Sequence, residues 1–286
     1  MKYSIITTAR NEDKYITATL ESVINQTTLP REWIIVNDSS VDKTLKIVQK
    51  YSTQYAWIKI INLDNYKPEL NSIGGRVSHI LNLAVQNLKH DCEIIVKLDA
   101  DTEFKPDFFK ELLQRFAENN KLGIASGNLV FNGEKESVDY TKPNLSPRGA
   151  VMLIRKELFD QVDGFFQSKG RGEDTLFGVA ARYHGWETRV FPIFFNHLKP
   201  ESSRHSFWHE EFNTGYYKGS IPYRCDYFLL TQIKHFKKRP IILGTLLQLT
   251  GYLFSRLIVN YRPFPEYVKV QLQKEQISYI NNKLDF

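Results

Sequence analysis

Short apolar runs alternate with segments of three-to-four-residue apolar spacing through the first half of this chain. The short runs predict β-strands at 3–8, 33–37, 57–63 and 93–98. The segments between them predict α-helices at 15–25, 42–51 and 77–88. Such alternation is typical of a wound α/β domain with helices flanking a mostly parallel sheet. Ser39, Ser40 and Asp42 offer side-chain oxygens to cap the helix at 42–51.

The same pattern continues to about residue 200. Further helices are predicted at 106–119, 156–162 and 174–184, and further strands at 123–131 and 150–154. The polar, proline-containing segment 132–148 is predicted to be irregular and close to the ligand-binding edge. We therefore expect one α/β domain over residues 1–200 and a mainly helical extension over residues 201–286.

The net charge of +6 is unevenly distributed along the chain. Residues 1–198 hold 25 basic and 25 acidic side chains, whereas residues 199–286 hold 13 basic and 7 acidic ones. This excess predicts an anionic partner for the extension. Because the basic run lies beside apolar residues and not in a compact basic groove, a membrane surface is favoured over nucleic acid. The run consists of Lys234, Lys237, Lys238 and Arg239.

The apolar stretch 241–259, which follows the basic run, has the pattern of an amphipathic helix. Gly244, Gln248, Gly251 and Ser255 form one stripe, opposite a broad leucine-rich side. Such a helix either anchors the protein at a membrane interface or packs on the α/β domain or on a second subunit of a homo-oligomer. Its polar residues argue against a membrane span.

The two cysteines and the amino terminus predict a cytoplasmic protein. Cys92 and Cys225 have no spacing suited to zinc or redox chemistry. The segment after Met1 is too short and too polar for the apolar core of a signal peptide. Any attachment would then be peripheral, on the inner face of the cytoplasmic membrane.

Two carboxylates follow the predicted strand 93–98 directly, in the sequence Asp99-Ala100-Asp101. The carboxyl ends of parallel strands are where α/β sheets bind ligands. Two hard oxygen ligands there suit Mg²⁺ or Mn²⁺ bound to a diphosphate. Taken alone, the Asp-x-Asp pattern is also common in ordinary loops.

Four segments, in their order and spacing, resemble the family 2 glycosyltransferases with the GT-A fold over about residues 1–200. They lie at 5–12, 33–44, 98–101 and 172–174. The resemblance implies nucleotide-sugar binding in residues 1–101 and the acceptor side in residues 102–200. The chain departs from the family at Ser39-Ser40-Val41, where relatives often carry glycine-serine-threonine. It also lacks the tryptophan-rich motif of processive synthases, which indicates a single transfer per encounter.

The resemblance implies a nucleotide-diphosphate-sugar donor, with UDP favoured by analogy. Asp38 then accepts a hydrogen bond from uracil or ribose, although it is also suited to cap the following helix. Arg10 is available to stack on the nucleoside or to pair with phosphate. The other donor-binding candidates are Thr8, Ala9, Glu12, Arg76 and Asp99.

The resemblance also implies a bound Mn²⁺ or Mg²⁺ ion. Asp101 is expected to bind it directly, and Asp99 to contact the ribose or a metal-bound water. His197 follows a short apolar run, at the place where some relatives supply a further metal ligand. The alternative for His197 is a structural role, with its imidazole hydrogen-bonded to the backbone.

Asp174 is the predicted general base, because in the resembled family the second residue of this Glu-Asp pair deprotonates the acceptor hydroxyl and the anomeric centre inverts. Glu173 is expected to orient the acceptor or the base. The structural alternative is that both acids are favoured by the dipole at a helix N-terminus.

The leading prediction is an inverting, metal-dependent glycosyltransferase that moves one sugar to a hydroxyl of a glycan or lipid-linked glycan in surface-polysaccharide synthesis. A nucleotidyltransferase is the second reading, but residues 8–12 lack its glycine- and lysine-rich loop. A non-catalytic, nucleotide-sugar-binding membrane scaffold is the third, and the presence of Asp99, Asp101 and Asp174 counts against it.

Overall fold

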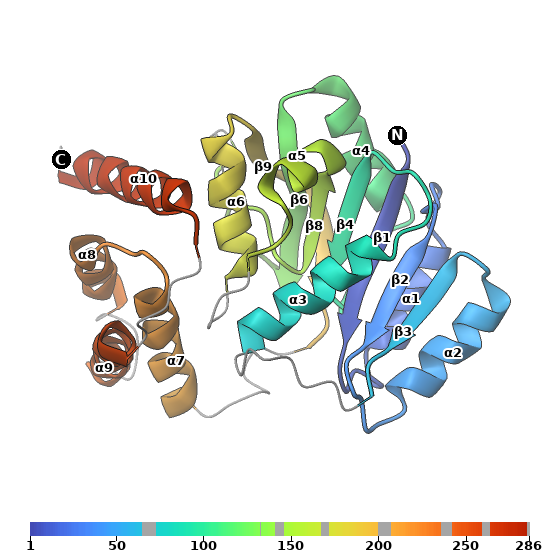
Figure 1. Ribbon diagram of the computed structural model, residues 1–286, viewed down its shortest axis with the longest axis horizontal. Coiled ribbons are helices and arrows are strands. Elements are labelled where there is room, and N and C mark those ends of the chain that lie inside the picture. The colour runs from blue at the N-terminus through green and yellow to red at the C-terminus, as the bar shows by residue number, and fades with distance from the viewer. Residues whose placement is uncertain are drawn as a thin grey trace. The chain divides into compact units, whose positions relative to one another are not determined.

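A computed structural model describes residues 1–64, 73–131, 133–140, 146–166, 172–199, 207–235, 242–258 and 264–284 (Figure 1). The chain divides into two compact units. The first unit comprises residues 1–69, 77–165 and 184–200. The second comprises residues 70–76, 166–183 and 201–286.

The first unit is built on a nine-stranded sheet with the order β3-β2-β1-β4-β8-β6-β9-β5, and β7 pairs with β6. Its first four strands are β1 (Tyr3–Ala9), β2 (Trp33–Asn37), β3 (Ile58–Asn62) and β4 (Ile94–Leu98). The others are β5 (Thr102–Phe104), β6 (Leu122–Phe131), β7 (Glu134–Lys135), β8 (Val151–Arg155) and β9 (Glu187–His197).

Strand direction places several carboxyl ends at one edge of this sheet. β1, β2, β3 and β4 are parallel, and β8 pairs antiparallel with β4. β6 is antiparallel to β8, and β9 is parallel to β6, so both run in the same direction as β4. The last residues of β1, β2, β4 and β9 therefore open onto the edge at which α/β sheets bind ligands.

Helices cover both faces of the sheet. One hydrophobic core holds apolar residues of the sheet together with α1 (Ile16–Ile24), α2 (Thr44–Gln54) and α4 (Phe108–Glu118). On the opposite face, toward the viewer in Figure 1, lie α3 (Ile73–Gln86) and α5 (Lys156–Val162). β1, β2 and β4 are thus buried on both faces, which explains their continuous apolar sequences.

The second unit is helical where it is described. Its helices are α6 (Glu173–Tyr183), α7 (Phe207–Ser220), α8 (Cys225–His235), α9 (Leu243–Ile258) and α10 (Glu266–Leu284). Arg182 of α6 forms a bidentate ion pair with Glu275 of α10. α7 and α9 pack backbone against backbone, because Gly215 and Gly219 of α7 meet α9 and Gly251 of α9 meets α7. No described helix combines the length and the apolar character needed to cross a membrane.

The predicted α/β architecture is confirmed, with several local differences. The strand β7 forms inside the segment 132–148 that was predicted to be irregular, and α3 begins at Ile73 and not at residue 77. The short strand β5 has no periodic pattern of its own and forms by pairing with the end of β9. α2 begins at Thr44 and not at residue 42, because the Asp42 carboxylate accepts the backbone N–H of Thr44 from outside the helix.

Candidate functional site

The loops after β1 and β2 are held together by hydrogen bonds between them. The Asn11 backbone N–H donates to the Ser40 hydroxyl, and the Val41 N–H donates to the Asn11 side chain. The Asp38 N–H donates to the carbonyl of Ala9. Thr8 and Ala9 are the last two residues of β1. These contacts fix the donor-binding candidates of the two loops as one group.

Arg10 and Asp38 form the charged pair of this edge. Arg10 Nη1 lies 3.8 Å from Asp38 Oδ2, with the guanidinium largely in solvent and the carboxylate buried. Asp42, and not Asp38, bonds the first residue of α2. Asp38 thus follows the end of β2 at the ligand-binding edge, with the largely exposed guanidinium of Arg10 beside its buried carboxylate.

Ser39 explains the departure from the family pattern. Its backbone φ is +53°, in the left-handed region where glycine is favoured over residues with a Cβ. The Ser39 hydroxyl donates to the carbonyl of Leu63 at 2.5 Å, which secures this conformation. The chain thus keeps the backbone geometry expected of glycine and fixes it with a side-chain bond to the loop after β3.

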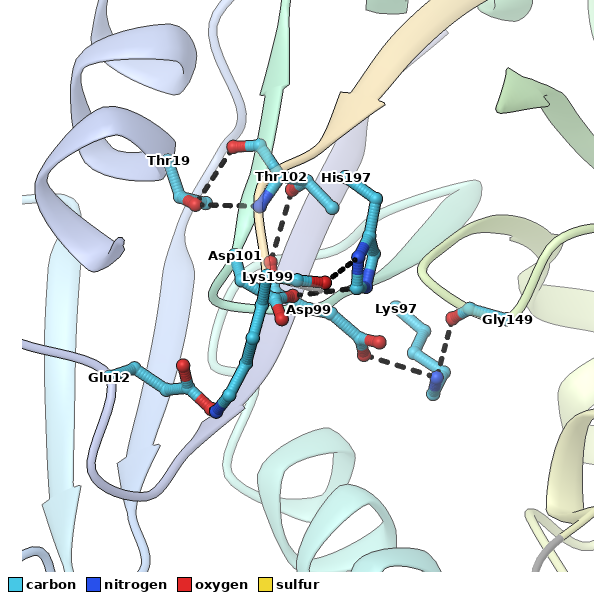
Figure 2. A network of polar contacts seen from close by, with 9 residues as sticks. All are labelled: Glu12, Thr19, Lys97, Asp99, Asp101, Thr102, Gly149, His197 and Lys199. Carbon is cyan, nitrogen blue, oxygen red and sulfur yellow. Dashed lines mark hydrogen bonds and ion pairs between the residues drawn. The ribbon is translucent and has the colours of Figure 1, made fainter. Parts of the chain in front are cut away.

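Asp99 and Asp101 stand at the end of β4 in different environments. The Asp101 side chain is 3% exposed, whereas that of Asp99 is 39% exposed. Thr102, which follows them, exchanges hydrogen bonds with Thr19 of α1: the Thr19 hydroxyl donates to the Thr102 carbonyl, and the Thr102 N–H donates to that hydroxyl (Figure 2). The loop that carries both carboxylates is therefore held in place by hydrogen bonds to α1.

His197 brings the end of β9 to the same place. Its Nε2 atom lies 3.5 Å from Asp101 Oδ1, and the Leu198 N–H donates to the Asp101 carbonyl. Its Nδ1 atom lies 2.9 Å from the carbonyl oxygen of Lys199. Because a carbonyl only accepts, Nδ1 donates this hydrogen bond, and in the neutral imidazole Nε2 is then the ring nitrogen that keeps its lone pair.

The three side chains fit a divalent cation. One ligand atom from each of Asp99, Asp101 and His197 lies within 4.8 Å of the other two. Ligands at 2.0–2.1 Å around an octahedral Mg²⁺ lie about 3 Å apart when adjacent and about 4.2 Å apart when opposite. Two carboxylates and one imidazole nitrogen suit Mn²⁺ or Mg²⁺. Small side-chain adjustments would bring the three ligand atoms to the spacing that such an ion requires.

Two lysines that the sequence analysis did not select also belong to this network (Figure 2). Lys97 is buried in β4, and its Nζ lies 3.3 Å from Asp99 Oδ1 and 2.5 Å from the carbonyl of Gly149. Lys199 Nζ lies 2.6 Å from the buried carboxylate of Glu12. A lysine inside the apolar run of β4 was a detectable signal, whereas nothing in the sequence paired Lys199 with Glu12.

Glu173 and Asp174 belong to the second unit and open α6. The Glu173 carboxylate accepts the N–H of Gly172, and the Asp174 carboxylate accepts the N–H of Thr175 at 2.7 Å. Gly172 has a φ of +109°, and a Cβ there would overlap the hydroxyl of Tyr217 from α7. Burial raises the pKa of Tyr217 well above its usual value, and the nearby Asp174 carboxylate adds to this, so the phenol stays protonated.

Arg76, the remaining donor-binding candidate, is the fourth residue of α3. The structure therefore brings together Asp99, Asp101 and His197, and separately Arg10 with Asp38 and Glu12 with Lys199. Glu173 and Asp174 lie in the second unit, near Tyr217.

Solved structures share this fold at low sequence identity. S. aureus TarS 1-349 in complex with UDP-GlcNAc aligns with a TM-score of 0.57 and 21% identity, over 90% of this chain and 74% of that chain. The mannosyltransferase PcManGT from Pyrobaculum calidifontis, in complex with GDP-Man and Mn²⁺, aligns with a TM-score of 0.58 and 13% identity, over 99% of this chain and 79% of that chain. The fold is therefore of the GT-A type.

Curated relatives match the sequence over part of their length. The minor teichoic acid biosynthesis protein GgaA of Bacillus subtilis is 26% identical over 211 residues, which are 71% of this chain and 44% of that protein. The poly-beta-1,6-N-acetyl-D-glucosamine synthase of Staphylococcus epidermidis is 28% identical over 125 residues, 44% of this chain and 28% of that protein. The chain thus spans less than half the length of these relatives.

The family model for glycosyl transferase family 2 matches residues 4–169, which are more than half of the chain. This range contains β1, β2 and β4, together with the Asp99 and Asp101 carboxylates at the sheet edge. Sequence and fold agree, and the chain belongs to glycosyl transferase family 2.

Proposed function

We propose that this protein is an inverting, metal-dependent glycosyltransferase that moves a single sugar from a nucleotide-diphosphate sugar to a hydroxyl of a glycan or lipid-linked glycan. The observation that carries the proposal is the cluster of Asp99, Asp101 and His197 at the carboxyl edge of a family 2 chain. A role in surface-polysaccharide synthesis is supported by the teichoic acid and poly-N-acetylglucosamine proteins among its relatives.

Donor binding is assigned to the loops after β1 and β2. The buried carboxylate of Asp38 accepts hydrogen bonds from the base or ribose, and Thr8 and Ala9 offer backbone groups along the nucleoside. Arg10, which is largely exposed, turns from Asp38 toward the phosphates. Arg76 is placed on the same donor by analogy. The bound UDP-GlcNAc and GDP-Man of the structural neighbours support a nucleotide-sugar donor, and UDP is favoured by analogy.

Asp101 and His197 would hold a Mn²⁺ or Mg²⁺ ion, and Asp99 would complete its coordination directly or through water. The ion, when bound, neutralises negative charge on the leaving diphosphate. The backbone carbonyl of Lys199 fixes the His197 imidazole by accepting a hydrogen bond from Nδ1–H, which keeps Nε2 available as a ligand. The Mn²⁺ in the structure of one neighbour supports a divalent ion of this kind.

Asp174 is the proposed base. Its carboxylate takes the proton of the acceptor hydroxyl as that oxygen attacks the anomeric carbon. The new carbon–oxygen bond forms as the bond from the anomeric carbon to the diphosphate breaks, and in-line attack inverts the configuration. Glu173 orients the acceptor or the loop, and it already accepts the N–H of Gly172. The reaction is placed in the cytoplasm, at the inner face of the cytoplasmic membrane.

The test begins with thermal shift and calorimetry across UDP-, GDP- and dTDP-sugars, with and without Mn²⁺. One nucleotide class should bind more tightly with the ion present. Asp101→Asn should abolish that gain and leave weak nucleoside binding, because an amide is a neutral ligand. Unchanged Mn²⁺-dependent affinity in this variant would contradict the metal role.

Asp174→Asn separates catalysis from binding. Loss of a general base typically costs roughly 10²- to 10⁴-fold in turnover, while donor affinity should stay at the wild-type value. NMR of the product should show an inverted anomeric configuration. Near-normal transfer by the variant, or retention in the product, would refute the assignment.

A further inference from the structure

The helix α9 exposes its apolar side. Among its outward-facing residues, Leu253 is 57% exposed and Leu257 is 80% exposed. At about 100° per residue, the exposed apolar side chains occupy an arc of about 140°. They are Leu246, Leu253, Phe254, Leu257 and Ile258. We call this set the α9 apolar face.

The side of α9 that is buried is its small and polar side. The buried residues are Gly244, Thr245, Gln248, Gly251, Tyr252 and Ser255. Gln248 donates to Glu211 of α7 at 2.6 Å and accepts from Gln232 of α8 at 3.1 Å. Gly251 lies against the backbone of α7, where no side chain fits. A surface helix ordinarily turns its apolar stripe inward. In α9 the small and polar side faces inward instead, and its contacts with α7 and α8 hold it in this orientation.

The sequence around α9 carries charge of one sign. Between Asp226 and Glu266 there is no acidic residue. The same stretch contains six basic ones: Lys234, Lys237, Lys238, Arg239, Arg256 and Arg262. The first four lie within the end of α8 and the segment that leads into α9. In the sequence, the apolar residues of α9 are therefore flanked by basic residues, and this combination matches a surface that offers hydrocarbon beneath anionic head groups.

We infer that the α9 apolar face inserts into the interfacial layer of an anionic membrane. The inference rests on the proposed function only for the location of the enzyme, and it names the surface and the residues that make the contact. A second copy of the chain suits this face less well, because a two-fold interface would pair two copies of a stretch whose sequence has six basic residues and no acidic one. At the membrane, the enzyme would meet lipid-linked acceptors by diffusion in two dimensions.

Vesicle sedimentation with the full chain tests the inference. Wild type should bind vesicles of phosphatidylcholine with phosphatidylglycerol, and bind phosphatidylcholine alone more weakly. Leu253→Ser/Leu257→Ser should lower the partition coefficient by at least about tenfold. The matched control is Leu29→Ser/Val41→Ser in the first unit, where the residues are 50% and 90% exposed. It should bind as wild type does.

Charge and depth are measured separately. Neutralising Lys237, Lys238 and Arg239 to glutamine should weaken binding to the anionic vesicles, and added salt should have less effect on this variant than on wild type. Leu257→Trp should be quenched by brominated lipid, whereas Val41→Trp should not.

Three outcomes would overturn the inference. They are equal binding of wild type and the double serine variant, absence of brominated-lipid quenching at residue 257, or a concentration-dependent dimer that the double serine variant loses. The last outcome would assign the α9 apolar face to a second copy. Because no donor or acceptor is present in the assay, Asp101→Asn should bind vesicles normally, which separates failure here from failure of the transferase assignment.

Discussion

Replacing Gly251 with alanine should destabilise the helical unit, although alanine is the better helix former. A Cβ at residue 251 would lie 2.8 Å from the backbone nitrogen of Tyr216 and closer still to the carbonyl oxygen of Phe212. Ordinary contacts of a Cβ begin near 3.4 Å. Both neighbours are backbone atoms of α7, so neither can rotate away. The nitrogen contact alone requires the two helices to separate by about 0.6 Å, and the oxygen contact requires more.

Two effects of opposite sign decide the outcome. The removal of glycine from the middle of a helix is worth about 1 kcal/mol of stability. Overpacking typically costs about 1–3 kcal/mol, and a rigid backbone contact puts this substitution at the upper end. The net expectation is a loss of about 2 kcal/mol. For a unit of about 110 residues, with about 2.1 cal/mol/K of unfolding entropy per residue, the melting temperature should fall by about 9 °C.

Thermal unfolding followed by circular dichroism and calorimetry measures the change. Thr250→Ala is the matched control, because Thr250 is the exposed neighbour on the same helix and alanine improves its helix propensity without a clash. Thr250→Ala should leave the melting temperature unchanged or raise it. If Gly251→Ala also raises the melting temperature, the close approach of α7 and α9 does not exist in solution.

Two further predictions concern the site. Lys199→Met should lower the free energy of unfolding, measured by urea denaturation, by about 3 kcal/mol, because the buried Glu12 carboxylate loses its 2.6 Å ion pair. The double variant Glu12→Gln/Lys199→Met should recover most of that loss. No recovery would contradict a direct ion pair. Gly172→Ala should lower turnover with little change in donor affinity, because a Cβ collides with the Tyr217 hydroxyl and displaces the start of α6. Adding Tyr217→Phe should restore part of the turnover. Unchanged turnover in Gly172→Ala would show that this contact does not position Asp174.

The sheet could be predicted from the sequence because its strands carry their own signal. β1, β2 and β4 are buried on both faces, so each is a continuous apolar run between polar loops. β5 could not be predicted, since its three residues are a strand only through pairing with β9. The Asp99 and Asp101 carboxylates were predictable because they directly follow β4, whereas the pairing of Glu12 with Lys199 joins segments that are far apart in the chain.

The orientation of α9 shows what periodicity leaves undetermined. The stripe of Gly244, Gln248, Gly251 and Ser255 was visible in the sequence, and so was the leucine-rich side opposite it. Which of the two sides is buried depends on α7, where Gly215 and Gly219 allow the backbones to approach. The periodicity of the α9 sequence cannot show that α7 carries glycines where the two helices meet, so it cannot show which side of α9 is buried.

The pairing of β9 has a consequence for any attempt to work with a shortened chain. The family match ends at residue 169, but β9 begins at Glu187, and it is the strand that joins β5 to β6. A fragment cut at the family boundary would lose His197 and Lys199 and would leave the edge of β6 unpaired and prone to aggregation. Synthesis from the ribosome meets the same constraint: Asp99 and Asp101, which follow β4, emerge nearly a hundred residues before His197, so the three side chains come together late in folding.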